Sequence, residues 1–97
     1  MQVRYRLQGV EFEWDDDKAR ANYDKHGVTF EEAAEVHFDP FYVAGDATRG
    51  DEERQFIIGY SLSERLLLTV YTERVGSLRI ISARPATRVE KRLYEHE

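Results

Sequence analysis

The sequence contains no cysteine, and this absence excludes several kinds of site at once. Disulfide bonds, thiolate nucleophiles and cysteine-ligated zinc sites all require that residue. Small secreted domains commonly depend on disulfides, so a reducing compartment is the expected environment. The N-terminal segment, MQVRYRLQGVEFEW, has no apolar run long enough for a signal peptide, and no stretch approaches the length of a membrane span. We therefore expect a cytoplasmic protein that does not interact with a membrane.

The sequence also lacks the short motifs of common catalytic and cofactor sites. It has no glycine-rich phosphate loop and no Gly-x-Ser-x-Gly element. Its three histidines, His26, His37 and His96, are not spaced with other ligands as metal sites require. We therefore expect neither a metal nor an organic cofactor.

Charge is distributed unevenly along the chain. The net charge of −5 does not favour nucleic-acid binding, but residues 1–48 hold five basic and eleven acidic side chains, while residues 74–92 hold six basic and one acidic. A local basic segment of this kind can hold phosphate groups within an acidic protein. We therefore expect the segment from 74 to 92 to form the functional surface.

Hydrophobic periodicity predicts one α+β domain spanning residues 1–97. Alternation indicates strands at 3–7 and 10–14. Asp15 and Gly27 are expected to cap a first helix, and Thr29 a second that ends before Pro40. Further strands at 41–44, 56–60, 66–72 and 78–83 are expected to form a four-stranded antiparallel meander.

Two further features are expected, one at the C-terminus and one on the faces of the sheet. Pro85 is expected in the first turn of a C-terminal helix that buries Ala86, Val89 and Leu93. The central strands are apolar on both faces, so we expect both faces of the sheet to be covered.

Arginine spacing is the main chemical signal. Arg74 lies at a predicted turn, Arg79 inside a strand, and Arg84 where that strand meets the last helix. Arginine binds phosphate oxygens in a bidentate manner, and several around one phosphate can stabilise the charge of a phosphoryl-transfer transition state. The alternative is that these arginines pair with Glu73, with Glu90 or with acids of the first helix.

Histidine and asparagine in the N-terminal half allow two interpretations. Lys25 and His26 can stabilise the C-terminus of the first helix through their charge, or His26 can act as a general acid or base. His37 lies on the apolar face of the second helix and is expected to be a packing residue. Asn22 is expected to form structural hydrogen bonds.

The ordered motifs resemble a known family. Residues 12–30 follow the pattern F-E-W-D-x-x-K-x-x-x-N-x-x-K-H-G-V-x-F. Phe38-Asp39-Pro40, Tyr71-Thr72-Glu73-Arg74 and Arg79-Ile80-Ile81-Ser82-Ala83-Arg84 then follow in sequence order. The sequence is similar to the BrnT toxins of bacterial type II toxin–antitoxin systems over nearly all of residues 12–95. Residues 1–11 lie outside the pattern, and His37 occupies a position where the family usually has an apolar aromatic residue.

The resemblance implies a RelE-like fold and a ribonuclease that inhibits translation. It also implies neutralisation by a BrnA-like antitoxin that carries a DNA-binding domain, so that operator DNA is bound only through the complex. The positions of interest in the family pattern are Lys25, His26, Arg54, Arg74, Arg79 and Arg84.

These observations lead to one principal hypothesis and two alternatives. The principal hypothesis is a metal-independent endoribonuclease. Its expected catalytic residues are Arg74, Arg79, Arg84 and His26, and its expected RNA-binding residues are Lys25, Arg54, Arg88 and Arg92. The first alternative is a catalytically inactive module that binds the antitoxin. A stand-alone DNA-binding regulator is less favoured, because no helix-turn-helix signal is present and the N-terminal helices are acidic.

Overall fold

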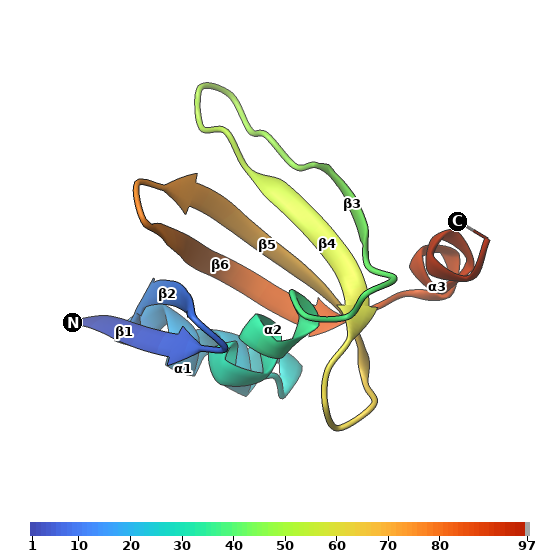
Figure 1. Ribbon diagram of the computed structural model, residues 1–97, viewed down its shortest axis with the longest axis horizontal. Coiled ribbons are helices and arrows are strands. Elements are labelled where there is room, and N and C mark those ends of the chain that lie inside the picture. The colour runs from blue at the N-terminus through green and yellow to red at the C-terminus, as the bar shows by residue number, and fades with distance from the viewer. Residues whose placement is uncertain (97) are drawn as a thin grey trace.

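The computed structural model describes residues 1–96 and consists of one six-stranded sheet with three helices (Figure 1). The elements, in chain order, are β1 (Gln2–Leu7), β2 (Val10–Asp15), α1 (Asp16–His26), α2 (Phe30–Val36), β3 (Val43–Asp46), β4 (Gln55–Tyr60), β5 (Leu66–Arg74), β6 (Ser77–Pro85) and α3 (Arg88–Glu95). Among residues 1–96, no helix is both long enough and apolar enough to cross a membrane.

The sheet has the strand order β1-β2-β6-β5-β4-β3. Strands β3 to β6 pair antiparallel with their neighbours in sequence, as a meander does. The predicted four-stranded sheet is nevertheless incomplete, because the β1–β2 hairpin adds to it and makes it mixed. Strand β2 pairs parallel with β6, at Phe12 with Leu78 and at Glu13 with Arg79. This pairing brings the N-terminal hairpin beside the arginine-bearing strand.

Local signals set the ends of the first two helices. The side chain of Asp15 accepts a hydrogen bond from the backbone N–H of Lys18 at 3.0 Å, and the side chain of Thr29 accepts one from Glu32 at 3.1 Å. Gly27 ends α1 with a positive φ of 70°, a backbone conformation that suits glycine. The predicted caps at Asp15, Gly27 and Thr29 are therefore confirmed.

The core lies between the sheet and the pair α1 and α2. The ring of Trp14 packs edge-on against Phe30 at 5.8 Å, and Phe12 packs against both His37 and Phe38. His37 is thus a packing residue, as the sequence predicts. Figure 1 shows α1 and α2 together beside the N-terminal hairpin, with α3 apart at the other end of the sheet.

Within residues 1–96 the second face of the sheet is covered only at its β4 end, where α3 contacts β4 and Ile58 is fully buried. The prediction that both faces are covered is therefore correct only in part, and the rest of this face is open. Leu68 and Val70 of β5 point to this open face and are only half-buried. Apolar residues on both sides of these strands therefore indicated a cover that extends over only part of the second face.

The C-terminal helix also differs from the prediction. Pro85 is the last residue of β6, and α3 begins after the N-cap Thr87, which forms a capping box with Glu90. No residue of α3 is buried; Val89 is 63% exposed and Leu93 is 48% exposed. Tyr94 attaches this helix to the sheet, because its ring packs edge-on against Tyr60 at 5.3 Å and its hydroxyl donates a hydrogen bond to Asp39 at 2.7 Å.

Candidate functional site

Three charged side chains form a row across the open face of the sheet. Arg4 of β1 lies opposite Glu13 of β2, and Glu13 lies opposite Arg79 of β6. Thr72 of β5 continues the row on the far side of Arg79. Residues directly opposite each other in neighbouring strands point to the same face, so the register alone brings these side chains together.

Glu13 is the centre of this row and is only 7% exposed. Its Oε2 atom lies 3.1 Å from Nη1 of Arg79, and its Oε1 atom accepts a hydrogen bond from the Ser77 hydroxyl at 2.7 Å. The bond from Ser77, with the charges of Arg79, Arg74 and Arg4, lowers the pKa of Glu13, although burial acts in the opposite direction. Glu13 is therefore ionised at neutral pH.

We call Arg4, Glu13, Arg74, Ser77 and Arg79 the Glu13 cluster. It combines three guanidinium groups with one carboxylate, so its net charge is positive. Arg4 and Arg74 are exposed, and no ion pair engages either of them within residues 1–96. A buried carboxylate that orients Arg79, beside the unpaired Arg4 and Arg74, is suited to binding an anion such as phosphate.

The side chain of Asn22 joins α1 to the edge of β6, near this cluster. Strand β2 leaves β6 after two residue pairs, so the edge of β6 is free beyond that point. The side-chain amide of Asn22 donates to the Ala83 carbonyl at 2.8 Å and accepts from the Ala83 N–H at 3.1 Å, in place of a neighbouring strand. It also donates to the Val28 carbonyl at 3.1 Å. The structural role predicted for Asn22 is confirmed.

The space between α1 and β6 holds a shallow hollow of about 280 Å³. Its lining is formed by Lys18, Ala21, Asn22, Lys25, His26, Ile81 and Ser82, and we call it the β6–α1 hollow. Two lysines and a histidine thus face one open depression. Ser82 follows Arg79 by three residues in the same strand, which places the hollow roughly 10 Å from the Glu13 cluster.

Arg84 lies apart from Arg74 and Arg79. Five residues of extended strand separate it from Arg79, a distance of roughly 16 Å. Its Nη1 and Nη2 atoms each donate to one carboxylate oxygen of Glu90, both at 2.8 Å. This contact raises the pKa of Arg84 and lowers that of Glu90. The structure does not bring the three predicted arginines around one point, and it shows the pairing with Glu90 that the sequence left open.

The other predicted RNA-binding residues lie outside the cluster. Arg54 precedes β4 and forms an ion pair with Glu52 of the same loop at 2.9 Å. Arg88 and Arg92 are exposed on α3. Within residues 1–96, no group of three or more histidine, aspartate or glutamate side chains is arranged to hold a metal ion.

Sequence reasoning missed Glu13 and Arg4 as site residues. The alternation of β2 contained a signal, because Glu13 lies between the core residues Phe12 and Trp14 and must point to the opposite face. No sequence pattern near Glu13 indicates that Arg79 lies beside it, because 66 positions separate the two residues in the sequence.

Comparisons with a family model and with solved structures agree with each other. The family described as the ribonuclease toxin, BrnT, of type II toxin–antitoxin systems matches residues 14–90. The crystal structure of the Brucella abortus ribonuclease toxin, BrnT, is similar, with a TM-score of 0.56 and 27% sequence identity over 77% of this chain and 94% of that one. No curated protein matches the chain in a sequence search.

Proposed function

Because the chain belongs to the BrnT family of ribonuclease toxins from type II toxin–antitoxin systems, we propose that it is an endoribonuclease whose site is the Glu13 cluster together with the β6–α1 hollow. The observation that carries this proposal is the buried, ionised Glu13 with three arginines around it. The positive charge that remains on Arg4, Arg74 and Arg79 matches the charge of an RNA backbone.

RNA binding follows from the arrangement along β6. One phosphate of the strand is held by Arg79 and Arg74, and a neighbouring part of the backbone lies over the β6–α1 hollow, where Lys25 offers an ammonium group. Arg88 and Arg92, exposed on α3, attract RNA without contacting the scissile bond. Arg54 contributes in the same way when its pair with Glu52 opens.

The proposed chemistry is transfer within the RNA itself. The 2′-hydroxyl attacks the adjacent phosphorus, the bond from phosphorus to the 5′-oxygen breaks, and the products carry a 2′,3′-cyclic phosphate and a 5′-hydroxyl. Arg74 and Arg79 stabilise the charge that develops on the non-bridging oxygens. His26 lines the β6–α1 hollow, roughly 10 Å from the cluster, which is beyond hydrogen-bond reach of that 2′-hydroxyl, so the expected general-base role of His26 is not part of this mechanism. Water accepts the proton from the 2′-hydroxyl and supplies one to the departing 5′-oxygen. The guanidinium groups supply the positive charge, so no metal ion is required.

Glu13 and Arg84 act through other residues in this mechanism. The lowered pKa of Glu13 makes it a poor proton donor, and its contact with Arg79 makes it a positioning residue. Arg84 is engaged by Glu90 at the start of α3, so its contribution to phosphate binding requires that this pair opens.

The partner follows from the family. A type II toxin is neutralised by a protein antitoxin, and we propose a BrnA-like protein encoded beside this chain. Operator DNA is then bound only by the complex, through the antitoxin. RNA cleavage that inhibits translation takes place in the cytoplasm.

The test is RNA cleavage by the purified protein in EDTA. We expect Arg79→Ala to reduce the rate by roughly 100-fold, the usual effect of removing one group that stabilises transition-state charge. Arg6→Ala is the matched control, because Arg6 lies on the same face of the sheet but outside the cluster and only pairs with Glu11 at 3.7 Å. Equal activity in wild type and Arg79→Ala, or no activity in the wild type, would contradict the proposal.

A catalytically inactive module that binds the antitoxin is the second candidate. The observation in its favour is that Arg79 and Arg84 are each paired with a glutamate, Glu13 and Glu90 respectively. This candidate predicts normal growth when the chain is expressed without the antitoxin. Growth arrest that the antitoxin relieves would exclude it.

A further inference from the structure

A second depression lies on the other side of α1, away from the β6–α1 hollow. It has a volume of about 310 Å³ and is enclosed by β1, α1 and the start of α2. Its accessible apolar surface comes from the half-buried Val3 and Ala19 and from Tyr23, which is 54% exposed, while the core residues Trp14 and Phe30 form its floor. We call it the α1–α2 pocket. Its size falls within the range of pockets that bind a defined group.

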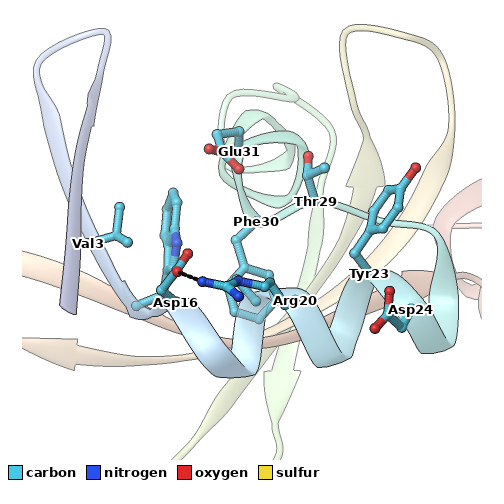
Figure 2. Close-up of a pocket in the computed structure, with 10 residues that line it drawn as sticks. Val3, Asp16, Arg20, Tyr23, Asp24, Thr29, Phe30 and Glu31 are labelled. Atoms are coloured by element: carbon cyan, nitrogen blue, oxygen red, sulfur yellow. Dashed lines mark hydrogen bonds and ion pairs between the residues drawn. The ribbon is translucent and has the colours of Figure 1, made fainter. Parts of the chain in front are cut away.

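Three carboxylates surround this apolar interior. Asp16 is paired with Arg20 at 2.8 Å, whereas Asp24 and Glu31 form no ion pair within residues 1–96. Figure 2 shows the Asp16–Arg20 pair along α1 and Glu31 on α2 above it. The pocket therefore combines an apolar interior with an excess of negative charge at its rim.

The surrounding surface has the same sign. Residues 15–35, which include α1 and α2, carry seven acidic and three basic side chains. A surface of this charge repels RNA and attracts a basic protein segment. The pocket is also separated from the proposed RNA site, because different residues of α1 line the two depressions. The pocket is lined by Ala19, Arg20, Tyr23 and Asp24, and the hollow by Lys18, Ala21, Asn22, Lys25 and His26.

We propose that the α1–α2 pocket is a docking site for the antitoxin, and that it receives an apolar side chain from a segment that also carries lysine or arginine. The apolar side chain packs against Val3, Ala19 and Tyr23, and the basic groups pair with Asp24 and Glu31. Burial of apolar surface at the centre with charge pairing at the rim is the usual anatomy of a protein interface. This inference depends on the antitoxin partner proposed above.

Two alanines on opposite sides of α1 provide a matched pair of variants. Ala19→Trp fills the α1–α2 pocket, and Ala21→Trp places the same side chain in the β6–α1 hollow. We expect Ala19→Trp to weaken antitoxin binding at least tenfold and to leave RNA cleavage unchanged. We expect the opposite result for Ala21→Trp: weaker cleavage and unchanged antitoxin binding.

Charge is tested separately with Asp24→Lys, which places a basic residue near the C-terminus of α1, where the helix tolerates it. We expect at least tenfold weaker binding at low salt, and a smaller difference at high salt. Asp51→Lys, in the exposed loop between β3 and β4, is the control and should bind as the wild type does.

The measurement is isothermal titration calorimetry with the purified antitoxin encoded beside this chain, on variants whose thermal unfolding has been checked. The inference is overturned if wild type binds and both Ala19→Trp and Asp24→Lys bind within twofold of it. It is also overturned if Ala21→Trp weakens binding as much as Ala19→Trp does and Asp51→Lys as much as Asp24→Lys does. The same holds if Ala19→Trp only dissociates a dimer of the toxin. Failure of the wild type to bind contradicts the partner assignment as well.

Discussion

His37 provides a quantitative test of how the core responds to pH. Its ring packs edge-on against Phe12 at 5.1 Å and Tyr71 at 4.8 Å, and within residues 1–96 neither ring nitrogen has a hydrogen-bond partner. Burial lowers the pKa of His37 from 6.5 to about 4. The folded chain therefore resists protonation of a ring that the unfolded chain protonates readily.

The sign and size of the effect follow from this difference in pKa. Between pH 6.5 and about pH 4, the unfolded state binds the proton at His37 and the folded state does not, so stability falls as the pH falls. The loss attributable to His37 between pH 7 and pH 5 is roughly 2 kcal/mol.

The perturbation is His37→Phe, which keeps an aromatic ring and removes the titrating group. We expect the variant to be as stable as the wild type at pH 7 or more stable by about 1 kcal/mol, because two unpaired nitrogens are removed. At pH 5 its advantage should grow by roughly 2 kcal/mol. Carboxylates such as Glu32, whose pKa is lowered to about 2 by Arg65, are common to both proteins and cancel in the comparison.

The assay is urea unfolding at several pH values, followed by the fluorescence of Trp14, the single tryptophan, which lies in the core. His96→Gln is the control, because His96 is exposed and its removal should leave the pH dependence as it is in the wild type. Parallel stability curves for the wild type and His37→Phe would refute the reasoning.

Three further changes test the site and its supports. Glu13→Gln removes the carboxylate that orients Arg79, and we expect kcat for RNA cleavage to fall about tenfold while KM falls or stays constant, since the arginine charge remains; unchanged kcat would exclude a positioning role. Tyr94→Phe loses the hydrogen bond to Asp39 and should cost about 1–2 kcal/mol, with faster amide hydrogen exchange confined to α3; uniform protection would show that other contacts hold the helix. Gly45→Ala would place its Cβ 2.4 Å from the Phe56 ring, and it should lower the free energy of unfolding in urea by about 1–3 kcal/mol. Gly76→Ala is the control, because a Cβ there meets nothing within 4 Å and costs only the strain of the positive φ. Equal losses of stability in the two variants would contradict the packing argument.

Local chemistry made part of the fold predictable. Asp15 and Gly27 set the ends of α1 through side-chain and backbone groups a few residues away, so the sequence alone identified them. Thr87 carried a comparable signal, with Glu90 three residues later, but the prediction placed the helix start at Pro85 instead. The error arose because proline suits a strand end as well as a first helical turn.

The candidate site was less predictable, because it depends on contacts between distant residues. Arg79 was identified from its charge, but its partner Glu13 lies in a strand whose parallel pairing with β6 no local pattern reveals. Arg84 was expected beside Arg79, yet strand geometry separates them and Glu90 lies within reach. Residue type therefore indicated the chemistry, and sheet register determined which side chains meet.

Analysis of the RNA ends produced in EDTA tests the central claim most directly. The proposed mechanism predicts fragments with a 2′,3′-cyclic phosphate and a 5′-hydroxyl from the wild type, and almost none from Arg79→Ala. Fragments with a 5′-phosphate, cleavage that requires a divalent metal, or undiminished cleavage by Arg79→Ala would contradict it.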